Sequence, residues 1–263
     1  MSIRIIYTLF VLLFVSFVWT GCDCIKGSGN IIEGTRSFSG IHSLSLNGDF
    51  EVHIRQDTLP SVLHIEAEDN LMPLIISEQG ADSILRIWWD EDKCLRKHEA
   101  IRLTINLPYL KKIENWGSGS ITAETDLAGS EFVSFHNDGS ANIKLKKVTA
   151  TLADIELEGS GGLIIDELNV ASVDSKLTGS GNIELKNGAC QAHDITLTGS
   201  GNLFSFYFET NNTDVVTSGS GNCEVYVTDE LNVLLSGTGS VFYRGNPTVL
   251  DMTITGTGVV EAD

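Results

Sequence analysis

A glycine triplet that recurs at nearly constant spacing constrains the fold of this chain more than any other feature. Successive copies start 18 to 22 residues apart, and alternating apolar residues lie on both sides of each copy. Such a repeat is typical of structural units that bury a core only when neighbouring copies stack. Gly-Ser-Gly or Gly-Thr-Gly starts at Gly117, Gly159, Gly179, Gly199, Gly219, Gly237 and Gly256, and a Gly-Ser-Ala copy starts at Gly139.

Aligning the copies produces columns of like residues. Four residues after the first glycine stand Ile121, Ile143, Leu163, Ile183, Leu203, Cys223, Val241 and Val260. Two residues before it stand Leu157, Leu177, Leu197, Thr217, Leu235 and Ile254. Strict alternation indicates strands with one buried face. We therefore predict an all-β fold, a parallel β-solenoid with coils of about 20 residues stacked at the ~4.8 Å spacing of paired strands.

The glycine triplets form the predicted corners of this solenoid. Two glycines one residue apart suit a bend that needs positive φ or a close approach of two backbones. The Ser or Thr between them, and an Asn that follows in several copies, can hydrogen-bond the backbone of the corner. The Asn column comprises Asn142, Asn182, Asn202 and Asn222.

The first residues have the features of an export signal. Arg4 is the only charge before Asp23, an apolar run extends from Ile5 to Val18, and small residues precede Cys22. This pattern indicates a secretory signal peptide. The sequence before Cys22 resembles a bacterial lipobox, which predicts lipidation of Cys22 and a membrane anchor at the new N-terminus. An uncleaved transmembrane anchor and ordinary signal cleavage remain as alternatives, although the apolar run is short for a bilayer span.

The charge of the chain excludes one class of partner. The formal net charge is −18, and removal of residues 1–21 takes away Arg4 and no acid, which leaves −19. Such a surface repels the phosphates of DNA and RNA, so we exclude nucleic-acid binding.

The remaining cysteines lie in a compartment that permits disulfides. Their spacing does not predict zinc, and we expect no cofactor. Cys190 and Cys223 fall at different phases of the repeat, so we expect them to be isolated core residues. The sequence leaves open whether Cys24, Cys94, Cys190 or Cys223 forms a disulfide.

Several segments together resemble a known bacterial family. Gly-Ser-Gly-Asn corners on a period near 20, behind a lipobox-like cysteine, are similar to the head GIN domain family of auto-transporter adhesins. The resemblance covers about residues 27–263 and implies a right-handed β-helix and a surface role in adhesion, with no catalytic residues. Outside the repeat it rests on Gly27–Asn30, Phe38–Ile41, Asp49–Ile54, Leu63–Pro73 and Ile101–Pro108.

These observations predict three segments. Residues 1–21 form the signal peptide, and residues 22–35 form a tether behind the lipid. Residues 36–263 form one head GIN-type β-helix, irregular over 36–116 and regular over 117–263.

One column of the repeat is acidic. Asp154, Asp174, Asp194 and Asp214 each stand five residues before a corner glycine, and Asn232 and Asp251 continue the column. A ladder of carboxylates could hold calcium. We favour instead a role in capping each turn, because hydrogen bonds from corner N–H groups would offset the repulsion of stacked carboxylates without metal.

A second candidate site is aromatic. The register places Leu203 and Ser205 inside, so Phe204 and Phe206 point outwards, and Tyr226 and Phe242 occupy corresponding positions in later coils. Four outward aromatics on three adjacent coils predict a contiguous apolar contact surface for a glycan or a protein. A local register flip, or cover by the C-terminal tail, is the alternative.

The sequence contains no pattern of catalytic residues. The histidines share no repeat phase, and no nucleophile elbow, HExxH or Walker loop is present. We expect a non-enzymatic, adhesin-like lipoprotein of the bacterial envelope, outer-membrane-bound and either surface-exposed or periplasmic. A purely structural envelope protein and, less favoured, a carbohydrate-active β-helix enzyme are the alternatives. The histidines are His42, His53, His64, His98, His136 and His193.

Overall fold

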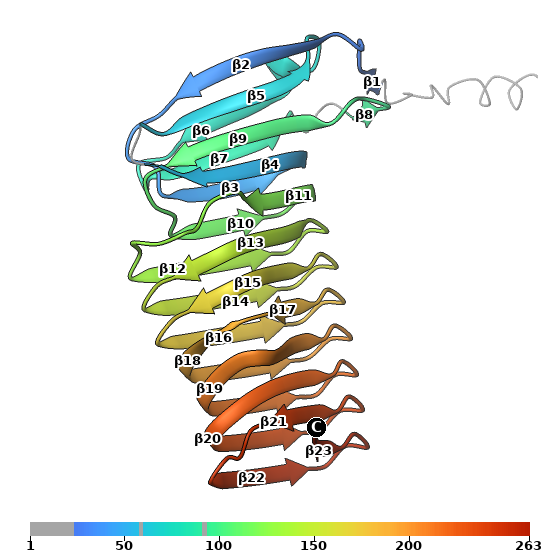
Figure 1. Ribbon diagram of the computed structural model, residues 1–263. Coiled ribbons are helices and arrows are strands. Elements are labelled where there is room, and N and C mark those ends of the chain that lie inside the picture. The colour runs from blue at the N-terminus through green and yellow to red at the C-terminus, as the bar shows by residue number, and fades with distance from the viewer. Residues whose placement is uncertain (1–23, 58–59, 91–93) are drawn as a thin grey trace, which may run out of the picture.

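The computed structural model describes residues 24–57, 60–90 and 94–263 (Figure 1). The described chain is an elongated stack of coils, and its two ends lie at opposite ends of the stack. The prediction of a β-solenoid is confirmed, because strands one coil apart pair in parallel throughout residues 112–262. Cys22, the predicted lipidation site, and the predicted signal peptide lie outside the described residues.

Each regular coil contributes strand segments to two ladders, which face each other across the core. One ladder contains the final strand segment before each corner, and the other contains the segment after it. In the regular region the strands are β10 (Lys112–Asn115), β11 (Ser118–Ala123), β12 (Phe132–Asn137), β13 (Asn142–Thr149), β14 (Leu152–Leu157), β15 (Leu163–Asn169), β16 (Ser172–Leu177), β17 (Ile183–Leu185), β18 (Gly188–Leu197), β19 (Leu203–Thr217), β20 (Cys223–Leu235), β21 (Val241–Arg244), β22 (Val249–Ile254) and β23 (Val260–Ala262).

The predicted apolar columns form the core. Ile143, Leu163, Ile183 and Leu203 pair in register from coil to coil and are fully buried. Burial of one such side chain stabilises the fold by roughly 1.5–3 kcal/mol. The second column, two residues before each corner glycine, ends with an exposed residue, Ile254, because β22 is the last strand of its ladder.

Most corners have two glycines because successive corners lie in close contact, and Ala141 is the exception. A Cβ at Gly201 would overlap the carbonyl oxygen of Gly181, and the same overlap recurs at the other corners of the regular coils. Among the corner glycines only Gly119 has a positive φ, so close approach and not backbone conformation selects glycine here.

The asparagine column stabilises the corners, as the sequence predicts. The Asn182 Oδ1 accepts a hydrogen bond from the backbone N–H of Asn202 at 2.9 Å, and the Asn202 Oδ1 accepts one from the N–H of Asn222 at 2.8 Å. The same bond runs from the N–H of Gly162 to the Asn142 Oδ1 and from the N–H of Ser240 to the Asn222 Oδ1, and Gly162, which has no side chain, interrupts the column before Asn182. Each amide therefore binds one coil to the next.

The opening region differs from the regular coils. β3, β4, β7 and β9 pair in parallel with the solenoid, but β2 pairs antiparallel with β5, β5 with β9, and β6 with β7. The antiparallel strands cover the first end of the stack (Figure 1). The elements are β1 (Ile25–Lys26), β2 (Ile31–Ser37), β3 (Ser43–Asn47), β4 (Asp49–Gln56), β5 (Val62–Glu68), a 3₁₀ turn η1 (Met72–Leu74), β6 (Ile75–Gln79), β7 (Ile84–Trp89), β8 (Leu95–Arg96) and β9 (Ile101–Leu107).

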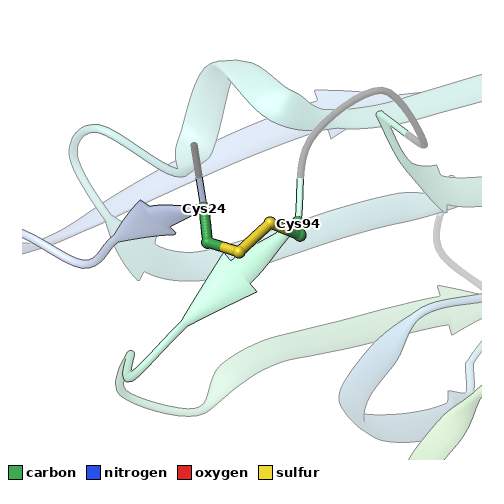
Figure 2. The surroundings of a disulfide bond; sticks show 2 residues. All are labelled: Cys24 and Cys94. Atoms are coloured by element: carbon green, nitrogen blue, oxygen red, sulfur yellow. A yellow bond between two sulfur atoms is a disulfide. The ribbon is translucent and has the colours of Figure 1, made fainter. Parts of the chain in front are cut away.

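The predicted tether covers residues 22–35, but its residues 25–35 belong to the folded domain. They include β1 and most of β2, and β2 pairs with β5 along its whole length. A disulfide joins Cys24 to Cys94, next to the parallel pair β1–β8 (Figure 2). The prediction of a tether was wrong because the partners of this segment lie about 30 to 70 residues away in the sequence, where no local pattern indicates the pairing. Cys190 and Cys223 are free and buried, as expected.

Candidate functional site

An outward column of alternating carboxylates and phenylalanines follows the ladder of β17, β19, β20, β21 and β23. Glu184 pairs with Phe204, which pairs with Glu224, and the column continues through Phe242 to Glu261. Leu203 and Ser205, on either side of Phe204, are fully buried. Phe204 therefore points outwards, as the alternation predicts, and it is half-buried between its neighbours.

The strand β19 contains an irregularity that strict alternation does not predict. Its pairing with β20 shifts register between Phe204 and Glu209. After this shift Tyr207 is 70% exposed and Phe208 is fully buried. Strict alternation would bury Tyr207 and expose Phe208, so a bulge adds Tyr207 to the outer surface.

Arg244, at the end of β21, lies against the aromatic residues of β19. Its guanidinium carbon is 4.2 Å from the centre of the Phe206 ring and 5.4 Å from that of Tyr207. The guanidinium also donates to the Asp263 carboxylate, with Nε at 2.7 Å from Oδ2. Hydrogen bonds to Asp263 and Tyr207 raise the pKa of Arg244 above its ordinary value. The protein thus holds one of its own cations between an aromatic face and a carboxylate.

These side chains surround an open hollow of about 560 Å³. A hollow of this volume can accommodate a small ligand or a few residues of a larger one. Its lining includes Glu184, Phe204, Phe206, Tyr207, Glu224 and Arg244.

The structure corrects the prediction of a contiguous apolar patch. Phe204 and Phe206 share the hollow, but Glu224 separates Phe204 from Phe242 in the column. Tyr226 pairs with Glu209 and Arg244 and does not line the hollow. The surface is therefore a mixed aromatic and charged one.

The aspartate column is in register, but it does not cap turns. Asp154, Asp174, Asp194 and Asp214 pair in sequence within the strands β14, β16, β18 and β19. The corner N–H groups donate instead to backbone carbonyls of the preceding coil, such as Gly161 N–H to Gly139 O. Burial, followed by the charges of Asp154 and Asp194, raises the pKa of Asp174. Within residues 24–57, 60–90 and 94–263, no three His, Cys, Asp or Glu side chains converge to hold a metal ion.

Comparison with known proteins identifies the family. Residues 38–247 match the family model described as "Putative auto-transporter adhesin, head GIN domain". This chain belongs to the head GIN domain family. No curated protein matches the chain.

Solved structures share the fold of this head GIN domain. A protein titled as a putative adhesin from Parabacteroides merdae superposes with a TM-score of 0.82 at 22% identity, over 92% of this chain and 99% of its own. A second, from Bacteroides fragilis, gives 0.71 at 22% identity over 91% and 100%. A Parabacteroides distasonis protein titled as a putative lipid binding protein gives 0.81 at 21% identity over 91% and 99%. At these identities the likeness establishes the fold alone.

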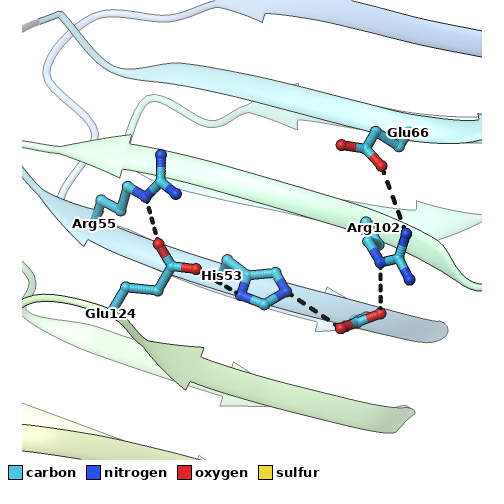
Figure 3. Close-up of polar contacts among 6 residues, drawn as sticks. His53, Arg55, Glu66, Arg102 and Glu124 are labelled. Atoms are coloured by element: carbon cyan, nitrogen blue, oxygen red, sulfur yellow. Dashed lines mark hydrogen bonds and ion pairs between the residues drawn. The ribbon is translucent and has the colours of Figure 1, made fainter.

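A polar network on the head GIN domain joins its opening region to the regular coils (Figure 3). His53 Nδ1 lies 3.0 Å from a carboxylate oxygen of Glu124, and His53 Nε2 lies 3.4 Å from one of Glu51. Arginines bind the outer sides of both glutamates, which lowers the pKa of each. These contacts link β4 to the loop after β11, so we assign the network a structural role. Its members are Glu51, His53, Arg55, Glu66, Arg102 and Glu124.

One histidine of the head GIN domain lies in the core. His193 Nε2 is 2.9 Å from Ser175 Oγ, and its ring contacts Phe208 edge-on. Burial lowers the pKa of His193 to about 3. The residues aligned with His193 in the neighbouring coils, Val173 and Thr213, are also buried, so the register of the repeat could have indicated an inward position for this histidine. Among the described residues, no helix has the length and apolar character needed to span a bilayer.

Proposed function

We propose that this head GIN domain is a non-enzymatic, adhesin-like binding module of the bacterial envelope. The family match and the solved relatives titled as adhesins support a role in adhesion. In this proposal a lipid on Cys22 anchors the chain to the outer membrane. The hollow beside Phe204 and Phe206 contacts a glycan or a protein.

One observation carries the assignment of the contact site. Phe204 and Phe206 are half-buried around a hollow of about 560 Å³. Aromatic faces next to carboxylates and an arginine offer both stacking and hydrogen bonds, which is the usual composition of a recognition site.

Binding of the mature chain to glycan arrays and to candidate host-surface proteins tests this proposal. We expect Phe204→Ala with Phe206→Ala to weaken binding by about tenfold or more, because aromatic anchors carry much of the binding energy at such sites. Tyr207→Ala supplies a second variant, since its exposed ring can be removed without disturbing the core. Phe132→Ala is the matched control, because Phe132 is 45% exposed but lies on β12.

Unchanged binding in both the double variant and Tyr207→Ala would contradict the assignment of the contact site. The anchor has a separate test in cells grown with a labelled fatty acid. The wild-type chain should incorporate the label and Cys22→Ser should not.

A further inference from the structure

The charges around the hollow are not balanced. Two cations approach it, but each already has a carboxylate partner outside the lining: Lys186 Nζ lies 3.0 Å from Asp166, and Arg244 lies 2.5 Å from Asp263. Glu184 and Glu224 form no side-chain hydrogen bond and no ion pair within 4 Å with any residue that the structure describes. The hollow therefore contains two carboxylates without a direct partner, and the nearby cations Lys186 and Arg244 act on them only at longer range.

These two carboxylates flank one aromatic ring. Glu184 pairs with Phe204 on one side and Glu224 pairs with it on the other. Neighbouring strands lie about 4.8 Å apart. A ligand group that contacts the Phe204 ring therefore lies about one strand spacing from the carboxylate on either side. An aromatic face attracts a cation, and a carboxylate in reach adds a charge-assisted contact.

The molecule contains the same arrangement with its own cation. Arg244 lies 4.2 Å from the centre of the Phe206 ring and pairs with Asp263. Phe204 with Glu184 and Glu224 reproduces that aromatic and carboxylate setting without an internal cation. Partial burial also raises the pKa of Glu224, because it disfavours the charged carboxylate. A bound cation would offset this energetic cost of burying the charge.

We infer that the hollow recognises an organic cation, an ammonium or guanidinium group held on Phe204 between Glu184 and Glu224. This inference rests on the proposed function and specifies the ligand chemistry of that site. The acidic surface, with a net charge of −18, concentrates such ligands around the protein. The cationic group can come from a lysine-bearing peptide or from an amino sugar.

Titration of the mature chain with small probes tests the inference. The charged probes are Nα-acetyl-lysine methylamide and glucosamine, and their neutral counterparts are the Nε-acetylated lysine derivative and N-acetylglucosamine. We expect at least one charged probe to bind more tightly than its neutral counterpart by about tenfold, with weaker binding at high salt. The preferred probe distinguishes a peptide ligand from an amino sugar.

Variants locate the interaction. Glu184→Gln with Glu224→Gln should weaken binding of the charged probe about tenfold, and Phe204→Ala should do the same. Asp194→Asn with Asp214→Asn removes the same total charge from the other ladder and should change affinity less than about twofold. Circular dichroism confirms that each variant is folded.

The outcomes separate this inference from the proposed function. If charged and neutral probes bind equally, or if the double glutamine variant binds as the wild type does, the cation site is wrong. A loss of adhesion in Phe204→Ala with Phe206→Ala would then still support the proposed contact site. If no probe binds, the inference is overturned, and the array experiment alone decides the proposed function.

Discussion

The opening region, residues 24–116, and the regular coils, residues 117–263, achieve stability in different ways. The opening region depends on individual long-range contacts: the Cys24–Cys94 disulfide, the antiparallel pairs of β2, β5 and β6, and the network around His53. The regular coils depend on one set of contacts repeated in each coil, namely apolar columns, the asparagine ladder and closely stacked glycines. The hollow beside Phe204 lies in the region that repeats one set of contacts.

The largest expected effect is on the free energy of unfolding, and it should differ between a glycine of the regular coils and a glycine of the opening region. Gly201→Ala places a Cβ against the carbonyl oxygen of Gly181, so the backbone of one of the two coils must shift to accommodate it. We expect a loss of about 3 kcal/mol or more in the free energy of unfolding. Gly40, in the opening region, has φ of 67° and open space around it. Gly40→Ala should cost only about 1–2 kcal/mol.

Urea denaturation of the two variants beside the wild type measures this difference. Equal losses in Gly201→Ala and Gly40→Ala would show that close contact between corners is not what selects glycine in the regular coils.

A smaller effect concerns pH and the core of the regular coils. The pKa of His193 is about 3 in the folded protein, below its ordinary value of 6.5, because burial disfavours the charged ring. As the pH falls below 6.5 the unfolded chain binds a proton that the folded chain does not bind until the pH approaches 3. Stability is therefore lost in this window, by about 3 kcal/mol between pH 7 and pH 4.

His193→Val removes the group whose protonation destabilises the folded protein at low pH. Valine should fit the core here, because Val173 occupies the aligned position of the preceding coil. Denaturation of both proteins at pH 7 and pH 4 should show a smaller loss in the variant than in the wild type. Should the two lose the same stability, the histidine does not remain neutral in the folded core.

The regular coils could be predicted from the sequence in detail, and the opening region could not. The corner period fixed the register of columns such as Ile183 and Leu203, because one repeat predicts the next. In the opening region, alternation alone does not distinguish parallel from antiparallel pairing, so the reversed strands β2 and β5 were not foreseen. The tether over residues 22–35 was assigned for the same reason, since nothing local indicates the pairing of Cys24 with Cys94.

The candidate site was foreseen in part. Phe204 and Phe206 were placed outwards from their register, and both line the hollow. Tyr207 was missed because a bulge in β19 breaks the alternation, and Arg244 was missed because its stacking on Phe206 joins two coils. The aspartate column was correct in register but wrong in role, because the corner N–H groups already bond to the backbone of the preceding coil.

Hydrogen–deuterium exchange of the protein with and without a saturating ligand from the array or probe experiments tests most directly whether the contact site lies in the regular coils. We expect slower exchange in peptides that cover residues 203–209 and 223–226, where the hollow lies, and little change in residues 24–116. Protection confined to residues 24–116, with none in the regular coils, would contradict it.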